Sequence, residues 1–468
     1  MKTTTLTKPK KTIVSLDTLN QLIGKENVLS MLEDRICYAY DGTKQKHIPD
    51  VVLRPRSAQH VSRILQYANK QDIPVYPRGA GSGLTGGAVP VEGGIVLDFT
   101  HMNKIVEIVP EDLTATVEPG VVTQTLQNEV AKYKLFYPPD PASAAFSTIG
   151  GNVAECSGGI TGLKYGVTRD YILSLEVVLA DGSVIHTGRK TLKSVTGYDL
   201  TRLLVGSEGT LGVFTQITVK LLPLPEKIET LLAFFTTPQD AVRTASQIIS
   251  NNILPRALEF IDKSSIDCIK GYNQEIQIPE EANAILLIDI DGKEASVKTE
   301  ASLIEKIALE NQPLSVISAK NAKERDALWE VRRVISPALY NIAPFKINED
   351  ICVPRSRILE TLGRIAEIHK RYPSLKVANF GHIGDGNIHV NIMYDEGDQQ
   401  RILAEKMIEE ILRTTVELGG TISGEHGIGN VKSAYVPLEI PHQELRIMKD
   451  IKHLLDPKGI LNPGKMFV

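Results

Sequence analysis

The sequence predicts an α+β protein of two or three domains, and three observations support this class. Its 468 residues exceed the roughly 100–200 that one domain usually holds. Short apolar runs of strand length alternate with amphipathic helical stretches on both sides of a proline-interrupted segment, residues 221–225. Hydrophobic residues make up 42% and charged residues 23%, which is a globular composition rather than a disordered one.

The first half begins with a polar tail and a helical segment, followed by a βαβ unit. Residues 51–53 form a short apolar strand, and Ser57 is a good N-cap for a helix with an apolar stripe. The next strand is expected at 73–76. Glycine-rich and strand-like segments continue to about residue 222. We therefore expect an N-terminal tail and helix in 1–45 and a first domain in 46–224.

The second half has a different pattern. Strands are expected at 230–235 and 284–290, and helices at 238–251 and 293–310. This alternation predicts an α/β-layered second domain in 225–405. Two further helices, at 399–418 and 442–455, flank a glycine-rich segment. The last part, 406–468, is expected to complete the site and return to the first domain.

Charge and cysteine usage narrow the function classes. Lys plus Arg number 52 and Asp plus Glu 56, a net charge of −4, whereas nucleic-acid binders carry a basic excess. The four cysteines are far apart, which disfavours a disulfide framework and a cysteine-ligated iron–sulfur cluster. Neither an apolar leader nor a run of about 20 apolar residues occurs. We expect a cytoplasmic protein with no intrinsic membrane segment.

A glycine-rich loop spans residues 77–87. Gly81, Gly83 and Gly86 satisfy G-x-G-x-x-G, but a Rossmann dinucleotide site needs a helix directly after this loop. Here more glycines and a strand at 95–99 follow, so NAD binding of that type is rejected. Backbone N–H groups of such a loop can instead wrap a pyrophosphate. A tight glycine turn without a ligand is the alternative.

Two further segments, 138–166 and 206–212, are rich in glycine and small polar residues. The order and spacing of the three segments resemble the FAD-binding domain of vanillyl-alcohol oxidase / p-cresol methylhydroxylase type flavoproteins, over about residues 45–224. The resemblance implies a two-part FAD-binding domain followed by a substrate (cap) domain. The first loop contains no histidine, so non-covalent FAD is expected. The implied FAD contacts are Pro77, Arg78, Gly79, Ala80, Gly81, Ser82, Gly83, Leu84, Thr85, Gly86, Asp140, Pro141, Ser143, Gly150, Gly151, Asn152, Ser157, Gly159, Tyr165, Glu208 and Gly212.

A possible metal site lies much later in the chain. If Asp385 and Gly386 form a two-residue hairpin turn, His382 lies directly opposite His389 and both share one face with Asn391. Two imidazoles so placed can bind one divalent cation, and a solvated pair of histidines is the alternative. Glu425 and His426 lie between glycines that could turn both side chains into one pocket. Two histidines plus a carboxylate form a catalytic metal pattern.

These segments, together with residues 461–465, resemble the D-lactate dehydrogenase / glycolate oxidase catalytic subunit / D-2-hydroxyglutarate dehydrogenase group, over about residues 45–468. The resemblance implies that Asn391 and His426 face the substrate and that Asn462 contacts FAD. It also implies one divalent metal ion, Zn, Fe or Mn. The implied metal ligands are His382, His389 and Glu425.

Two features of the sequence bear on the identity of the substrate: an arginine on an expected helix, and a position where this chain departs from the family pattern. Arg332 and Ser336 are spaced i, i+4 on an expected helix, and the family places an arginine here to hold the substrate carboxylate. Arg333 and a simple surface charge are the alternatives. Relatives acting on 2-hydroxyglutarate carry a lysine where this chain has Asn348, with Lys346 nearby. This departure favours a small monocarboxylate, D-lactate or glycolate.

The resemblance implies an FAD-dependent dehydrogenase of a small D-2-hydroxy acid. His426 would take the hydroxyl proton, since a histidine titrates near pH ~6.5, and FAD would accept the hydride at N5. The sequence shows no second redox centre, so an electron-acceptor protein is expected, such as an electron-transfer flavoprotein or an iron–sulfur subunit. Three alternatives remain: an electron-transferring subunit with a vestigial substrate site, a D-2-hydroxyglutarate dehydrogenase, and a non-redox member related to ether-lipid synthesis.

Overall fold

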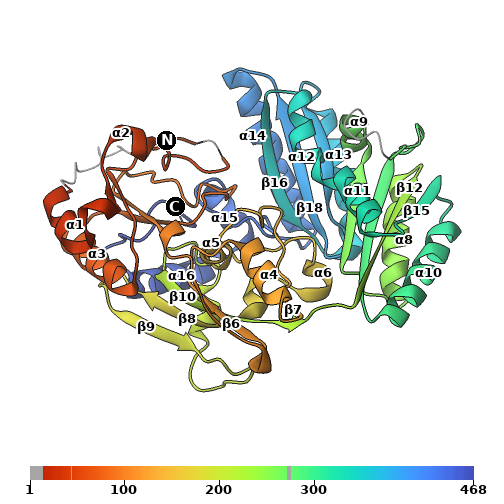
Figure 1. Ribbon diagram of the computed structural model, residues 1–468. Coiled ribbons are helices and arrows are strands. Elements are labelled where there is room, and N and C mark those ends of the chain that lie inside the picture. The colour runs from red at the N-terminus through yellow and green to blue at the C-terminus, as the bar shows by residue number, and fades with distance from the viewer. Residues whose placement is uncertain (1–13, 44, 271–275, 468) are drawn as a thin grey trace.

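The computed structural model describes residues 14–43, 45–270 and 276–467. The chain forms two halves that lie side by side (Figure 1). The first is built on smaller sheets, ordered β1-β2-β4-β3, β5-β6-β10-β8-β9 and β11-β7, and the second on one seven-stranded sheet. The prediction of an α+β class is confirmed.

The four-stranded sheet contains the expected βαβ unit. Its strands are β1 (Val28–Leu29), β2 (Val51–Leu53), β4 (Ile95–Asp98) and β3 (Val75–Arg78), and its helices are α1 (Leu16–Ile23), α2 (Leu32–Ile36) and α3 (Ala58–Gln71). Ser57 caps α3, with its side chain accepting from His60 N–H. β3 begins two residues later than expected and includes the start of the glycine loop. Residues 79–94 contain no helix, which confirms the argument against a Rossmann site.

The five-stranded sheet is antiparallel between its neighbours. Its strands are β5 (Ile105–Val109), β6 (Thr114–Val117), β10 (Val213–Lys220), β8 (Ile172–Val178) and β9 (Val184–Gly188). The adjoining elements are α4 (Thr123–Ala131), β7 (Leu135–Phe136), α5 (Ile149–Glu155), α6 (Gly162–Tyr165), α7 (Leu200–Leu204) and β11 (Leu222–Pro223). The second glycine-rich segment, 138–166, includes α5 and α6, and the third, 206–212, joins α7 to β10.

The seven-stranded sheet has only antiparallel neighbours. Its strands in spatial order are β15 (Ser315–Ser318), β12 (Lys227–Phe235), β14 (Ala284–Gly292), β13 (Ala257–Asp262), β17 (Lys376–His382), β18 (Asn387–Tyr394) and β16 (Phe345–Cys352). Both faces are buried, since Leu231 and Ala233 enter one core while Leu232 and Phe234 enter the other.

Helices cover both faces of this sheet. One core includes residues of α8 (Pro238–Ser250), α10 (Glu294–Glu310), α13 (Ile358–Lys370) and α14 (Asp398–Glu417). The other includes residues of α9 (Lys263–Ile269), α11 (Ala322–Arg333) and α12 (Ile335–Ala338). The predicted helices at 238–251, 293–310 and 399–418 are therefore confirmed to within a residue at each end.

The predicted register of the histidine hairpin is wrong by two residues. β17 and β18 are joined through residues 383–386, and Phe380 rather than His382 is paired with His389. The longer turn is fixed from outside, because Gly386 O accepts a hydrogen bond from Val353 N. A shift of two residues keeps a side chain on the same face of a strand. His382 and His389 therefore still share a face, with ring centroids 5.2 Å apart.

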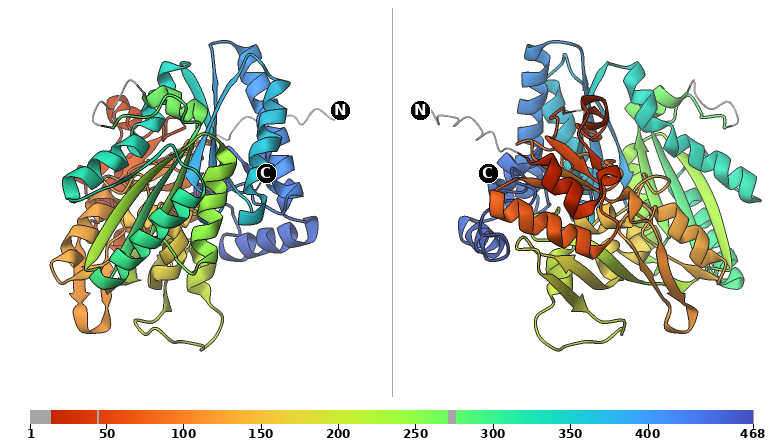
Figure 2. Two further views of the ribbon diagram at one scale, coloured as in Figure 1. Left: turned by 90° about the vertical axis from the view of Figure 1, so that its right-hand side faces the viewer. Right: turned by 60° about the vertical axis from the view of Figure 1, so that its left-hand side comes forward.

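The C-terminal segment returns to the first half. Helix α15 (Val436–Glu439) is followed by α16 (His442–Leu455), and Ile451 and Leu455 of α16 pack against the core of the five-stranded sheet. Figure 2 shows α16, in dark blue, away from the seven-stranded sheet. The expected division at 405/406 falls within α14, so we place it after Glu417. Among the described helices, none has both the length and the apolar composition needed to cross a membrane.

Candidate functional site

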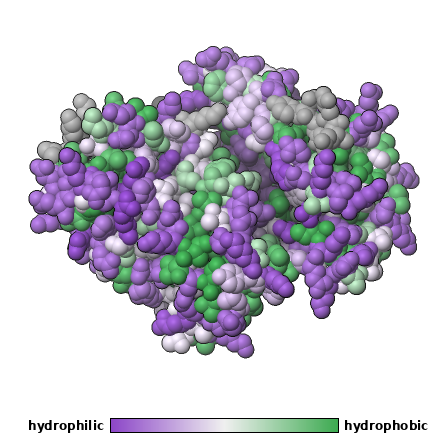
Figure 3. All heavy atoms as spheres, viewed as in Figure 1, coloured by the Kyte–Doolittle hydropathy of each residue, from purple (hydrophilic) through white to green (hydrophobic). Residues whose placement is uncertain are grey.

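The three glycine-rich segments line one cavity of about 360 Å³ in the first half. Twelve residues implied to contact FAD in the first and second segments lie on its wall, as do Glu208 and Asn462. The apolar side chains of Leu84 and Phe146 border it and are 41% and 56% exposed. Figure 3 shows apolar surface in the middle of this face, surrounded by polar side chains. The implied contacts on the wall are Pro77, Gly79, Ala80, Gly81, Ser82, Gly83, Leu84, Pro141, Ser143, Gly151, Asn152 and Ser157.

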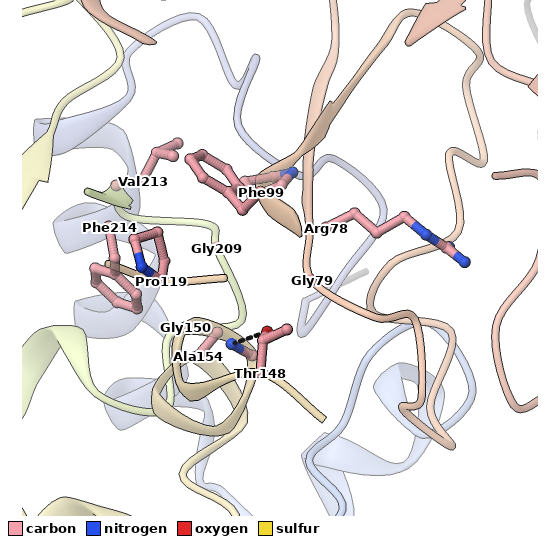
Figure 4. Close-up of a pocket in the computed structure, with 13 residues that line it drawn as sticks. Arg78, Gly79, Phe99, Pro119, Thr148, Gly150, Ala154, Gly209, Val213 and Phe214 are labelled. Carbon is pink, nitrogen blue, oxygen red and sulfur yellow. Dashed lines mark hydrogen bonds between the residues drawn. The ribbon is translucent and has the colours of Figure 1, made fainter. Parts of the chain in front are cut away.

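A small recess of about 50 Å³ continues this cavity under the first loop (Figure 4). Gly150 and Gly212 line it, together with the backbone of Arg78. The guanidinium of Arg78 points away from the recess (Figure 4) and donates to Tyr40 O at 2.8 Å. The FAD contact implied for Arg78 would therefore be made by its backbone and not by its guanidinium.

Five other implied FAD contacts lie off the cavity wall. Gly86 lies against Asn430, and Gly159 lies against the carbonyl of Asp140. Tyr165 donates its hydroxyl to Asp291 in the second half at 2.9 Å. Asp140, the residue whose carbonyl lies against Gly159, is itself buried, and burial raises the pKa of its carboxyl group. Thr85 borders a different cavity, described below.

Three potential ligand atoms lie close together beside the glycine-lined cavity, which Glu425 lines. Glu425 Oε1 is 3.4 Å from both His382 Nε2 and His389 Nε2. The ring nitrogens and the carboxylate oxygen lie within 4.8 Å of one another. His389 Nδ1 has no hydrogen-bond partner among the described residues. Two nitrogen donors and one carboxylate oxygen fit a divalent transition metal.

The loop that carries Glu425 and His426 is held by two buried carboxylates. Asp350 Oδ2 accepts hydrogen bonds from the backbone N–H of both residues, each at 2.8 Å. Glu208, from the first half, accepts from the N–H of Ile428 and Gly429, each at 2.7 Å. Both side chains, Glu425 and His426, consequently reach the glycine-lined cavity.

Behind His382 lies a buried acid that sequence analysis missed. Glu259 is fully buried on β13, and its Oε1 is 2.5 Å from His382 Nδ1. Its other oxygen accepts from Arg332 Nε at 2.8 Å, and the Arg332 guanidinium lies 4.4 Å from the Phe380 ring centre. A carboxylate on the far nitrogen of a metal-ligating histidine fixes the tautomer and raises ligand basicity. The available signal was an acid between apolar neighbours within β13.

The pKa values in this cluster follow from its buried charges. Burial would raise the pKa of Glu425, but the charge and hydrogen bond of His382 lower it to about 2. Burial, with the neighbouring imidazoles of His382 and His426, lowers the pKa of His389 to about 3. Burial would also lower the pKa of His382, yet Glu259 and Glu425 raise it well above its ordinary value. A neutral imidazole and an ionised carboxylate are both competent metal ligands.

A second cavity, of about 670 Å³, meets the first at His426 and Leu84. Ser336, Lys346 and Asn348 line it. Arg332 does not line this cavity, and Ser336 belongs to α12 rather than to the helix of Arg332, which ends at Arg333.

Ser336 Oγ accepts from Lys346 Nζ at 2.8 Å. Arg333, the alternative to Arg332, is about half exposed and pairs with Asp326 at 2.7 Å. Asn391 is fully buried beside His389, and its Oδ1 has no partner among the described residues.

Comparisons with known proteins show the family of this chain. The chain matches two family models, "FAD binding domain" over residues 49–188 and "FAD linked oxidases, C-terminal domain" over 224–466. It is 45% identical to the glycolate oxidase subunit GlcD of Bacillus subtilis, covering 97% of each chain. It is 38% identical to a D-lactate dehydrogenase of Archaeoglobus fulgidus, covering 89% of this chain and 91% of that one. A D-2-hydroxyglutarate dehydrogenase of Stutzerimonas stutzeri is 31% identical, with 97% and 98% covered.

Among solved structures, p-cresol methylhydroxylase with substrate bound has the same fold, with a TM-score of 0.80 at 18% identity, covering 97% of this chain and 96% of that one. The two matched models together account for both halves of the structure. The chain belongs to the FAD-linked oxidase family of FAD-dependent oxidoreductases and has the p-cresol methylhydroxylase fold.

Proposed function

We propose that the protein is a metal-assisted dehydrogenase that oxidises a small D-2-hydroxy acid, D-lactate or glycolate, to the 2-oxo acid. One observation carries the proposal: the glycine-lined cavity ends at Glu425 and His426, where His382 and His389 complete a three-donor group. The cavity proposed for the cofactor and the three-donor group proposed for the metal therefore meet at Glu425. The names of the similar D-lactate dehydrogenase and glycolate oxidase subunit support the substrate class.

Bound FAD would supply the hydride acceptor of this reaction. The backbone of residues 79–84 and the side chains of Asn152, Ser157 and Asn462 would hold it, since all of them line the cavity. Asn462 is fixed for this role, because its Nδ2 donates to Gly87 O and Glu208 O while its Oδ1 has no partner among the described residues.

A divalent metal held by His382, His389 and Glu425 would polarise the hydroxyl and carboxylate oxygens of the substrate. His426 would take the hydroxyl proton at Nε2, which lies 3.9 Å from Glu425 Oε1. Asp350, 3.8 Å from His426 Nδ1, would orient the ring and stabilise its charged form. Asn391 would face the substrate with its unpartnered Oδ1 as an acceptor, because its Nδ2 already donates to Ala378 O and His389 O.

The position of Arg332 changes its proposed part in the reaction. It is bound to Glu259 and lines neither cavity, so it acts here on Glu259 and His382. Direct contact with the substrate carboxylate, as the resemblance implies, would need this ion pair to open.

Electrons must then leave the flavin, and we propose a partner protein as acceptor, an electron-transfer flavoprotein or an iron–sulfur subunit. The four cysteines of this chain are free, so the described residues hold no disulfide that could accept them. The relative from Bacillus subtilis is named as a subunit, which supports a multi-protein assembly.

Anaerobic mixing of the yellow protein with D- and L-hydroxy acids tests the proposed reaction. We expect D-lactate or glycolate to bleach the flavin in the wild type. His382→Ala removes one of the three proposed metal ligands and should slow bleaching by at least about 100-fold, as expected for losing a metal that supplies several kcal/mol. His442→Ala, at an exposed position, is the matched control and should bleach normally. Unchanged bleaching in His382→Ala would show that the metal group has no part in oxidation.

A dicarboxylic 2-hydroxy acid is a second candidate, and the position of Lys346 favours it. Asp350, Asn348 and Lys346 follow one another on the same face of β16, opposite His389, Asn391 and Met393. A substrate extending from the metal group along this row would reach the Lys346 ammonium in the second cavity. Lys346→Met should then lower kcat/KM for D-2-hydroxyglutarate at least about tenfold while leaving D-lactate within threefold. Equal loss on both substrates would remove this candidate.

A further inference from the structure

Glu155, at the C-terminal end of α5, borders the flavin cavity and has no assigned role. Its side chain lines both the glycine-lined cavity and another cavity, of about 370 Å³, behind the 421–428 loop. The Oε2 atom has no contact with solvent and no hydrogen-bond partner among the described residues. A buried carboxyl oxygen without a partner costs free energy, so its position calls for a functional explanation.

A second carboxylate lies next to it. A Cβ built on Gly427 would be 2.3 Å from Glu155 Oε2 and 3.0 Å from Glu208 Oε1. The two carboxyl groups therefore flank the same glycine. Like charges at neighbouring positions in a buried site repel, so ionisation of one carboxyl favours the protonated form of the other.

The hydrogen bonds decide which group is ionised. Glu208 accepts two backbone N–H groups, from Ile428 and Gly429, and such donors favour a charged carboxylate. Glu155 Oε2 receives none. Burial, followed by the charges of Glu208 and Asp41, raises the pKa of Glu155 well above its usual range, and Lys465 offsets this only in part. Burial also raises the pKa of Glu208, but its two N–H donors offset this in part, so Glu155 is the group expected to keep its proton.

We propose that Glu155 is a cofactor-contacting residue whose protonated carboxyl donates a hydrogen bond to the ring system of bound FAD. Gly427 is adjacent to His426, so Glu155 lies at the end of the cavity that is closest to His426 and the three-donor group. A reduced flavin carries more negative charge than an oxidised one, and a neutral donor favours it, whereas an ionised carboxylate would oppose it. Glu155 thereby raises the reduction potential of the flavin without transferring its proton.

Two substitutions at Glu155 with side chains of similar size test separately whether the residue donates a hydrogen bond and whether it is charged. Glu155→Gln keeps a neutral donor, and we expect the ratio of dissociation constants for reduced and oxidised FAD to stay within about threefold of wild type. Glu155→Leu removes the donor and should weaken reduced FAD relative to oxidised FAD by about tenfold, equal to a potential about 30 mV lower for two electrons. Glu111→Gln, an exposed acid, is the control and should change nothing.

Dye-equilibration potentials and FAD titrations measure these values without substrate. A rise in potential of about 30 mV or more in Glu155→Gln would overturn the proposal, because it would mean that the native group is charged. A Glu155→Leu protein with the wild-type potential would also overturn it, since the carboxyl would then not contact the ring. These outcomes are independent of which hydroxy acid is oxidised.

Infrared difference spectra of wild-type protein, oxidised minus reduced, keep the test open if Glu155→Leu does not fold. We expect the C=O band of a protonated carboxyl to shift on reduction and to be absent in Glu155→Gln. If no such band exists in the wild type, Glu155 is not a neutral acid beside the flavin and the proposal fails.

Discussion

Replacing Glu259 by Gln tests whether a buried acid behind His382 supports both the fold and the metal group. The side chain is fully buried, and it receives Arg332 Nε at 2.8 Å and His382 Nδ1 at 2.5 Å. Removing one partner of a buried ion pair costs about 3–5 kcal/mol. The Arg332 side chain is 14% exposed, so water can reach part of it. We therefore expect a loss near the lower end, about 3 kcal/mol.

The same substitution should weaken metal binding about 10–100-fold, the usual effect of losing the partner of a ligating histidine. Urea unfolding gives the first quantity, and titration of chelator-treated protein with Zn²⁺ or Mn²⁺ gives the second. Asp289→Asn is the matched control, because Asp289 is a buried acid in the same sheet that accepts from Trp329 and contacts no histidine. It should lose stability but keep its metal affinity. Equal metal affinity in Glu259→Gln and wild type would refute the reasoning.

Three further outcomes follow from the site. Gly427→Ala should lower the melting temperature and cost at least about 1–2 kcal/mol. The backbone φ is +87° there, and the new methyl group would lie 2.3 Å from a carboxylate oxygen. The control Gly363→Ala, on an open helix surface, should be neutral or stabilising in the same thermal scan. Asp350→Asn should lower kcat about 10–100-fold, because the backbone N–H groups of Glu425 and His426 lose their shared anion, and stopped-flow bleaching measures this. Chelation should abolish bleaching while the visible FAD spectrum persists, and added metal should restore it.

Periodicity and turn chemistry predicted several individual elements, whereas the arrangement of the domains was implied by the family resemblance. The apolar stripe after Ser57 predicted a helix, which the structure has as α3. The absence of a helix after the glycine loop argued against a Rossmann site, and the next regular element is indeed a strand, β4. The strand at 73–76 was placed too early. Pro77 can still lie in β3 because that strand is at the edge of its sheet, a position that sequence pattern alone does not reveal.

The sequence predicted the candidate metal ligands, but it did not predict the buried acids that hold those ligands in place. His382 and His389 were paired through the strongest local turn signal, yet contact between Gly386 and Val353 lengthened the turn. Local sequence carries no record of that distant contact. Glu259 and Asp350 were missed as supports for the same reason, since their partners lie 123 and 75–76 residues away.

The loop carrying Glu425 and His426 has a consequence for exchanging parts between related enzymes. One of its anchors, Asp350, belongs to the seven-stranded sheet, and the other, Glu208, comes from the FAD-binding half. A chimaera that joins the FAD-binding half of one enzyme to the cap of another would inherit the loop with only one matching anchor. Substrate preference should therefore transfer only when the 423–429 loop and the acids that hold it are moved together, even though the two halves have separate cores.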